Sequence, residues 1–297
     1  MVSIGPLMPT SPPPMTEHRS SLIPAHAGHL RALIVDDHPI NTRVMTVLLQ
    51  QMGLHCVCVG DGAAAVDAVA QGRVDVVFMD YHMPKVDGFE ATARIRQLPA
   101  PLNHTPVVVV TADVCSNTQL GAHAVGADAF LAKPVRVHEL KAALAQALTA
   151  RVGSSAWVDD RQETGTITAS GADAQTAPPP RTRLAMINPD IFQELRDIIP
   201  ADQWQVMLDS LFAPSSGDVD QLLDVLHQGP RSAIGDQAHK IKGAAMLMGL
   251  TRLGEAAAEL EHLARRSSDA IDAPAWCTRI AALAQDSHQA ALTLLKA

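Results

Sequence analysis

The chain is poor in aromatic residues and has no basic surplus. Phe, Trp and Tyr together make up 3% of its 297 residues, and the formal net charge is -8. Binding of DNA or RNA usually needs a basic face with stacking side chains or a recognition motif. Acidic residues outnumber basic residues both before and after residue 180. The composition therefore argues against a nucleic-acid partner.

Membrane and export features are missing as well. No stretch approaches the roughly 18 consecutive apolar residues that span a bilayer. The opening segment, MVSIGPLMPTSPPPM, has no basic cluster followed by an apolar run. Four cysteines lack CxxC or metal-ligand spacing, which is typical of neutral thiols in a reducing compartment: Cys56, Cys58, Cys115 and Cys277. We expect a soluble, cytoplasmic protein with no membrane partner.

Composition and periodicity divide the chain into four parts. Residues 1–29 show no sustained period and are expected to form a flexible tail. Residues 30–150 and 186–297 are each long enough for a domain with its own core. Between them, residues 151–185 are rich in Gly, Ser, Thr, Ala and Pro, which predicts a flexible linker.

The first domain alternates short apolar runs with helical stretches, which predicts a doubly wound, five-stranded parallel sheet with helices on both faces. The expected strands are 31–35, 55–59, 74–79, 106–110 and 128–131, and the expected helices are 39–52, 62–71, 88–97, 116–124 and 136–149.

The second domain reads as an all-α bundle. Asn188 is a suitable helix cap, with Pro189 in the favoured first position. Pro214 and the following Ser-Ser-Gly predict a kink or break inside the second helix. The expected helices are 189–198, 201–227, 231–248, 250–266 and 274–296.

Polar residues of the first domain fall where the predicted strands end. Asp36 and Asp37 follow LIV, Asp80 follows VVFM, Thr111 follows VVVV, and Lys133 follows FLA. Functional groups of a parallel sheet collect at this edge. Carboxylates suit the hard Mg²⁺ ion, whose other positions stay open to phosphate oxygens. A carboxylate could then attack phosphorus while the metal, lysine and threonine stabilise the transferred group.

The second domain carries a histidine of special interest in the run AHKIKGAAMLMG. His239 lies off the apolar stripe of its helix, and Lys242 and Gly243 share its exposed patch three and four residues later. A neutral imidazole nitrogen there could attack phosphorus beside an ammonium group. We expect Gly243 and Met246 to contact a partner around the histidine. The alternative is that Met246 is tucked into the edge of the bundle.

These segments resemble the sequence signatures of two known domain families. LIVDDHPIN, MDYHMPKVDG, VVVVTAD and FLAKPV resemble the signatures of response-regulator receiver domains, which have a flavodoxin-like fold. The HxxKG run resembles histidine phosphotransfer (HPt) domains. The receiver resemblance implies that Asp80 is the phosphoacceptor, that Asp37 binds Mg²⁺ directly and Asp36 through water, and that the backbone carbonyl of His82 is a further ligand.

The same resemblance assigns the remaining receiver positions. Thr111 and Lys133 would bind the phosphoryl group, and Phe130 would move with Thr111 on activation. Lys133-Pro134 resembles the usual cis peptide bond of the family. His82 and Asp113 occupy positions at which receiver domains vary their rate of dephosphorylation.

The resemblance to the two-component families implies a phosphorelay intermediate. A receiver aspartate would take a phosphoryl group from a sensor or hybrid histidine kinase, and His239 would exchange one with a receiver aspartate, including that of a downstream response regulator. The sequence has no DxGxG nucleotide-binding signature, so we expect no kinase activity; the receiver would catalyse only its own phosphorylation and dephosphorylation. Alternatives are a separated carboxyl-terminal part of a hybrid kinase, a phosphate sink or interaction module, and a metal-dependent phosphatase.

Overall fold

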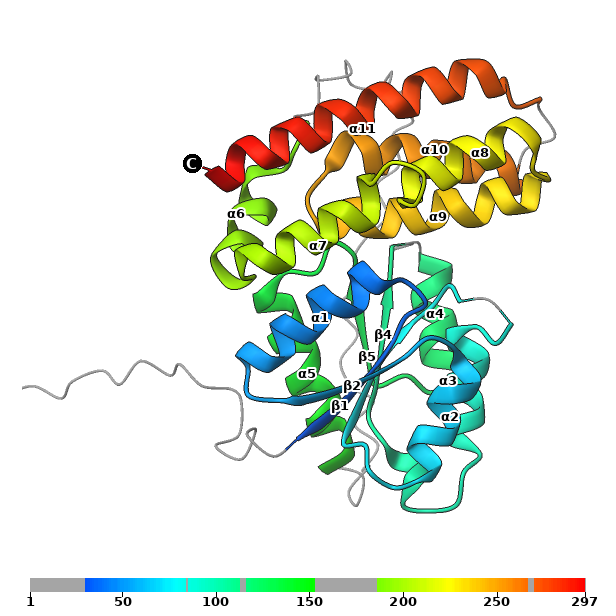
Figure 1. The fold of residues 1–297 in the computed structure, drawn as a ribbon. Helices are drawn as coiled ribbons and strands as arrows, with labels where there is room; N and C mark the ends of the chain where they lie inside the picture. The colour runs from blue at the N-terminus through cyan, green and yellow to red at the C-terminus, as the bar shows by residue number, and fades with distance from the viewer. Residues whose placement is uncertain (1–29, 84, 113–115, 153–185, 267–269, 297) are drawn as a thin grey trace, which may run out of the picture.

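The computed structural model describes residues 30–83, 85–112, 116–152, 186–266 and 270–296 (Figure 1). These ranges leave out the expected tail, most of the expected linker, and two residues named above, Asp113 and Cys115. The expected boundaries of the tail and linker therefore stay predictions. Within the described ranges, no helix is both long and apolar enough to cross a bilayer.

The first domain is built around a parallel sheet with the strand order β2-β1-β3-β4-β5. Its strands are β1 (Arg31–Val35), β2 (His55–Val59), β3 (Val76–Asp80), β4 (Val107–Thr111) and β5 (Ala129–Ala132). Its helices are α1 (Pro39–Gln51), α2 (Gly62–Ala70), α3 (Gly88–Arg96), α4 (Ser116–Ala124) and α5 (Val137–Val152), with a short 3-10 turn at Leu102–His104. This is the doubly wound fold that the sequence predicts.

Each face of the sheet packs against its own set of helices (Figure 1). Ile34 and Phe78 point to the side covered by α1 and α5, whereas Leu33 and Val77 point to the side covered by α2, α3 and α4. Successive side chains of a strand point to opposite faces, so a strand covered on both faces must be apolar throughout. This explains continuous runs such as VVVV in β4.

The last three strands end one residue later than the apolar runs predict. Asp80 pairs with Val110, and Thr111 pairs with Ala132. The sequence-based prediction stopped at the last apolar side chain, but the backbone ladder is indifferent to side-chain polarity. The polar groups therefore lie on the final rung of the sheet, where the strands hold them rigidly. The Lys133-Pro134 peptide bond is cis, as the resemblance implied.

The second domain consists of helices, and α8 to α11 form its bundle. The helices are α6 (Pro189–Ile198), α7 (Ala201–Phe212), α8 (Asp218–Gln228), α9 (Arg231–Leu247), α10 (Thr251–Arg266) and α11 (Ala273–Lys296). The side chain of Asn188 caps α6 by accepting from the backbone N–H groups of Asp190 and Ile191. Helices α6 and α7 contribute large buried side chains to this domain, such as Phe192 and Trp204.

The predicted break after residue 212 is confirmed, and it separates α7 from α8 completely. Ser215 has a φ of 64°, in the left-handed region. A Cβ atom on Gly217 would lie 2.7 Å from the backbone nitrogen of Ala213, so the turn requires glycine there. The single helix expected over residues 201–227 is thus two helices.

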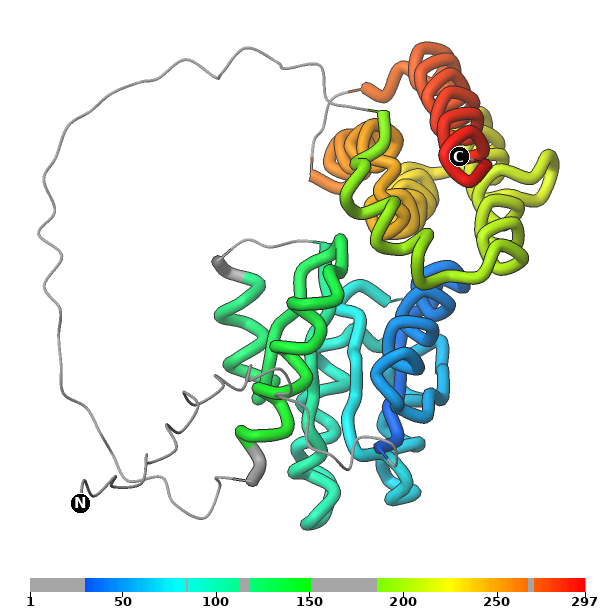
Figure 2. The backbone as a smooth tube through the Cα atoms, turned by 90° about the vertical axis from the view of Figure 1, so that its left-hand side faces the viewer, coloured from blue at the N-terminus to red at the C-terminus, as the bar shows by residue number. Residues whose placement is uncertain are grey.

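The helical domain lies over the carboxyl edge of the sheet. Helix α1 of the first domain contacts α6, α7 and α9 of the second (Figures 1 and 2). Side chains of both domains belong to one continuous buried apolar cluster. The contact brings His239 to the edge where the acidic residues lie, and nothing in the sequence predicts it.

Candidate functional site

Three carboxylates gather at the carboxyl ends of β1 and β3. One oxygen from each of Asp36, Asp37 and Asp80 lies within 4.8 Å of the others. The side chains of Asp36 and Asp80 are buried, and the Nζ atom of Lys133 lies 2.9 Å from Asp36 and 3.2 Å from Asp80. The structure thus brings together four of the predicted site residues from three separate segments.

Local hydrogen bonds fix the orientation of this cluster. The Oδ1 atom of Asp36 accepts from the backbone N–H of His38 and from the side-chain amide of Asn41, both at 2.9 Å. Thr111 is buried at the end of β4, and its carbonyl accepts from the N–H of Lys133 at 2.7 Å. Thr111 at the end of β4 and Lys133 directly after β5 therefore lie next to each other beside the carboxylates.

Burial and mutual repulsion disfavour the ionised forms of Asp37 and Asp80. Burial raises the pKa of Asp80 to about 8; Lys133 opposes this rise, while Asp36 and Asp37 add to it. Burial, followed by the charge of Asp36, also raises the pKa of Asp37. Burial opposes the charge on Lys133, but its two carboxylate neighbours outweigh burial and raise the pKa of the ammonium group. Oxygen donors in this arrangement suit a hard divalent cation.

Gly88 is a site residue that is not among those predicted from the sequence. A Cβ atom there would lie 2.2 Å from the backbone oxygen of Asp80, a distance no side chain could tolerate. The N–H of Gly88 also donates to the carbonyl of Tyr81 at 3.0 Å. The start of α3 therefore packs directly on the end of β3. A glycine following MDYHMPKVD was the available signal.

His239 is held by a carboxylate from the neighbouring helix. Its Nδ1 atom lies 2.7 Å from Oε1 of Glu261, and the other oxygen of Glu261 lies 3.3 Å from Nζ of Lys242. The HxxKG run predicts that Lys242 acts beside the histidine, and this role stays a prediction. Glu261 contacts both side chains, because α10 packs along α9 and presents this carboxylate to both.

The environment of Glu261 keeps it ionised. Burial alone would raise the pKa of Glu261, but the hydrogen bond and charge of His239, together with Lys242 and Arg265, lower it to about 2. A carboxylate at Nδ1 favours the tautomer that carries its proton on that atom. The lone pair of the ring then resides on Nε2, which makes Nε2 the nucleophilic atom.

The position of Glu261 in the sequence of α10 is itself a signal of its role. The inward stripe of α10 includes Leu253, Ala257, Leu260 and Ala264, and Glu261 lies at the border of that stripe. An acidic residue there is buried, as the structure shows, and a buried carboxylate needs a partner.

The acidic cluster and His239 face each other across the boundary between the domains. A cavity of about 310 Å³ is lined by residues of both, including Asp37, His82, His239 and Lys240. The ring centroids of His82 and His239 are 4.7 Å apart. Burial, followed by the nearby charge of His239, lowers the pKa of His82 to about 4, so His82 is neutral at neutral pH.

The remaining predicted residues have different surroundings. A Cβ atom on Gly243 would lie 3.4 Å from the side-chain nitrogen of Asn41, so this glycine contacts the first domain of its own chain. Met246 is half-buried and packs against Gly254 of α10, in line with the alternative that it lies at the bundle edge. Its docking role stays a prediction. Phe130 is half-buried on β5, on the side of the sheet covered by α2, α3 and α4.

Comparison with known families identifies both domains. The response regulator receiver domain family matches residues 32–145, and the Hpt domain family matches residues 206–290. The chain therefore contains a response regulator receiver domain followed by an Hpt domain, as the sequence motifs predict.

Curated relatives come from several bacteria. The sensor histidine kinase RcsC of Salmonella typhi is 40% identical over 38% of this chain and 12% of its own length. The sensory/regulatory protein RpfC of Xanthomonas campestris is 36% identical over 44% of this chain and 18% of its own. The sensor histidine kinase AruS of Pseudomonas aeruginosa is 26% identical over 90% of this chain and 24% of its own. The chain thus spans less than a quarter of the length of these relatives.

Proposed function

We propose that the chain is a phosphorelay intermediate in which Asp80 accepts a phosphoryl group from a histidine and His239 exchanges one with a receiver aspartate. The observation that carries this proposal is the arrangement at the domain boundary. There the carboxylate cluster with Lys133 faces a histidine whose Nδ1 atom is held by Glu261.

Asp80 is the proposed nucleophile of the receiver domain. One carboxylate oxygen would form a bond to phosphorus while the P–N bond of the donor phosphohistidine breaks, and the donor imidazole would leave with the electron pair. Lys133 already contacts Asp80, and together with Thr111 it would stabilise the oxygens of the transferred group. Both groups are buried, so they need little reorganisation during the reaction.

The acidic cluster also fits the proposed Mg²⁺ cofactor. Asp36, Asp37, Asp80 and the backbone carbonyl of His82 would hold the ion. When bound, Mg²⁺ neutralises charge on the carboxylates and on the phosphoryl oxygens. The pKa values of Asp37 and Asp80 are raised by burial and by the neighbouring carboxylates, and this supports the assignment, because a bound divalent cation would favour the ionised form of both groups.

His239 would react through Nε2. A P–N bond would form to Nε2 while the P–O bond to a receiver aspartate breaks and the carboxylate leaves. The imidazole ring would then carry a positive charge, with its proton kept on Nδ1 and facing Glu261. The ionised Glu261 would balance that charge, and Lys242 would hold Glu261 in place.

The proposed partners follow from the chemistry of the two domains, since an aspartate that accepts and a histidine that exchanges phosphoryl groups both need a protein to react with. We propose a sensor or hybrid histidine kinase as the donor, a downstream response-regulator receiver as an acceptor, and the cytoplasm as the location. The chain itself would act as a phosphotransfer intermediate, not as a kinase.

Removal of Mg²⁺ tests the proposed function. In Mg²⁺ the full chain should take up radioactive phosphate from acetyl phosphate, and in excess chelator the uptake should fall to background. Added Mg²⁺ should also raise the melting temperature, because a ligand that binds only the folded state stabilises it. Unchanged uptake in chelator would contradict the proposed metal site. A second receiver that gains phosphate from the labelled chain would exclude the phosphate-sink alternative.

Substitution of Glu261 tests how His239 is positioned. Glu261→Ala removes the partner of Nδ1, and we expect transfer to His239 to slow by about 10- to 100-fold, the cost of removing a carboxylate that orients a metal-bound histidine in the same way. Glu261→Gln keeps an oxygen that can accept from Nδ1 and should slow transfer less. Glu259→Gln is the matched control, since Glu259 lies on the same helix in an exposed ion pair with Arg279.

The ionisation state of Glu261 can be tested through the dependence of stability on pH. The pKa of Glu261 is lowered from its usual 4.5 to about 2. A carboxylate with a lowered pKa stabilises the folded state fully above its unfolded pKa, and this contribution is lost as the pH falls through the folded value. The contribution of Glu261 to the free energy of unfolding should therefore stay constant between about pH 6 and pH 8, measured as the difference in stability between wild type and Glu261→Ala. A difference in stability that disappears within this range would show that Glu261 is not held ionised in the folded chain.

A further inference from the structure

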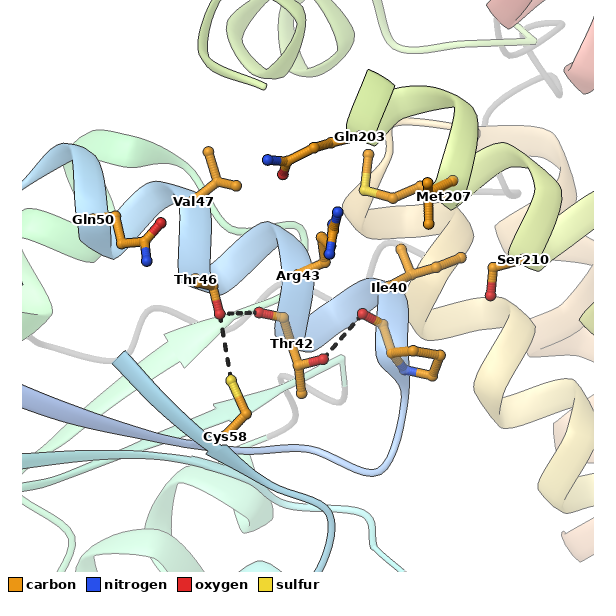
Figure 3. Close-up of a pocket in the computed structure, with 12 residues that line it drawn as sticks. Ile40, Thr42, Arg43, Thr46, Val47, Gln50, Cys58, Gln203, Met207 and Ser210 are labelled. Carbon is orange, nitrogen blue, oxygen red and sulfur yellow. Dashed lines mark hydrogen bonds between the residues drawn. The ribbon is translucent and has the colours of Figure 1, made fainter. Parts of the chain in front are cut away.

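Two polar contacts join the domains, and apolar side chains of both domains pack together between them. Figure 3 shows one side of this boundary, where Ile40, Arg43 and Val47 of α1 lie across a pocket from Met207 of α7. Leu247 of α9 lines a small cavity together with Asp36, Asp80 and other receiver residues. The Hpt domain therefore contacts the surroundings of the acidic cluster in its own chain.

The first polar contact joins His38 to Asp218. His38 is buried, and its Nδ1 atom accepts from the N–H of Ile40 at the start of α1. Nε2 must therefore carry the proton, which it donates to Oδ2 of Asp218 at 2.9 Å. Both ring nitrogens are used, one within the receiver domain and the other across the boundary. The contact thus ties the first turn of α1 to the first turn of α8.

The same aspartate connects to the helix that carries the reactive histidine. The side-chain amide of Gln237 donates to the carbonyl of Asp218 at 3.1 Å. Gln237 lies two residues before His239 on α9. The His38–Asp218 contact therefore fixes the position of α9 relative to the receiver.

The second polar contact centres on Glu194 of α6. Its Oε1 atom accepts from the N–H of Val137 at 3.0 Å, and its Oε2 atom lies 3.5 Å from the guanidinium of Arg136. A carboxylate at the start of α5 also interacts favourably with the helix dipole. The receiver is thereby held at α5 as well as at α1.

Between these contacts, the helix surfaces approach closely. Gly243 of α9 lies against the side chain of Asn41, where an added Cβ atom would be 3.4 Å from Nδ2. Asn41 in turn orients Asp36. Two polar contacts flanking a closely packed centre define a single relative orientation of the domains, because each contact needs a particular donor at a particular place.

We propose that Asp218 and Glu194 are specificity determinants that make the Hpt domain the preferred phosphotransfer partner of the receiver in the same chain. The proposal rests on the proposed function and adds the partner of His239. Neither Asp218 nor Glu194 belongs to the reacting groups, so their role is recognition. The shared chain makes the encounter intramolecular, with an effective concentration on the order of millimolar.

The central variant reverses both contacts in the full chain: Asp218→Lys combined with Glu194→Lys. Its matched control is Asp224→Lys combined with Asp197→Lys, which changes the net charge equally at exposed positions on the same two helices. Asp218→Asn serves as the conservative variant, because an asparagine oxygen can still accept from Nε2 of His38. Each protein is labelled from acetyl phosphate in Mg²⁺, and aspartyl and histidyl phosphate are separated by their opposite stability in acid and base.

We expect wild-type transfer to His239 to proceed at a rate that does not depend on protein concentration. The double variant should transfer at least about tenfold more slowly, corresponding to the loss of about 1.4 kcal/mol of association free energy. Labelling of Asp80 should persist in it, and the control and Asp218→Asn should stay within about twofold of wild type. Small-angle X-ray scattering should show a larger radius of gyration for the double variant alone.

The outcomes separate this inference from the proposed function. If wild-type transfer slows in proportion to dilution, the partner is a second copy of the chain and the inference is wrong, although the relay stands. If the double variant keeps both the wild-type rate and the wild-type radius of gyration, Asp218 and Glu194 are not specificity determinants. If Asp80 takes no label in any of the proteins, the proposed function itself fails. Even in that case, the radius of gyration shows whether Asp218 and Glu194 hold the domains together, because small-angle scattering needs no phosphate.

Discussion

Asp80→Asn will leave the receiver domain without base-labile phosphate after incubation with acetyl phosphate and Mg²⁺. Asn cannot form the acyl phosphate, and Asp80 alone ends the central strand beside the other two acids and Lys133. The expected effect is complete loss of aspartyl phosphate, measured as acid-stable, base-labile label. Such label persisting within residues 30–150 of the variant would overturn the assignment.

The stability of the same variant separates lost chemistry from lost folding. The pKa of Asp80 is raised from 3.8 to about 8 in the folded chain, chiefly by burial. Because the folded value lies above the unfolded one, ionisation of Asp80 opposes folding, and the stability in chelator should fall as the pH rises between these values. Asp80→Asn should flatten this pH dependence in thermal melts while it abolishes labelling. A variant that melts earlier than wild type at pH 8 would contradict this account of the site.

His239→Gln will abolish phosphotransfer to the Hpt domain. The amide has no nucleophilic nitrogen to replace Nε2, although it can still contact Glu261 at the same place. Acid-labile, base-stable label should disappear, and the helical content measured by circular dichroism should remain. Labelling of Asp80 should also remain, since Asp80 reacts within the other domain.

Two other histidines of the bundle provide controls. His262 lines a cavity with Glu261 and Lys242, close to the reacting histidine, whereas His227 lies near Cys277. Neither is followed by a lysine and a glycine three and four residues later. His262→Gln and His227→Gln should therefore keep the acid-labile label. If the acid-labile label disappears in one of these variants and persists in His239→Gln, the reactive histidine is the one substituted in that variant and not His239.

The elements that the sequence predicts well are those with a strong local period. The alternation of strands and helices in the receiver domain and the helices of the Hpt domain follow from apolar spacing alone. The motifs also place Asp36, Asp37, Asp80 and Lys133 correctly at one edge, because parallel strands must end there together. The ends of β3 and β4 were placed one residue short, since Asp80 and Thr111 are polar but still belong to the ladder.

The features that the sequence did not predict depend on contacts between distant segments. Glu261 reaches His239 only because α10 packs along α9, and no local period reports the partner of a buried carboxylate. Gly88 is needed because α3 begins against the end of β3. The contact of His38 with Asp218 joins residues 180 positions apart in two domains. Such pairings can be recognised only once the tertiary structure is known, because in the sequence each partner looks like an ordinary polar surface residue.

The central claim is that one phosphoryl group can occupy both Asp80 and His239. The most direct test labels the wild-type chain from acetyl phosphate in Mg²⁺, removes the donor, and follows the label by peptide mapping. The protein concentration should be high enough to allow exchange both within and between chains. We predict base-labile label at Asp80 first and acid-labile label at His239 afterwards, at the expense of the first. Label that stays on Asp80 until it hydrolyses, and never reaches His239, would contradict this claim.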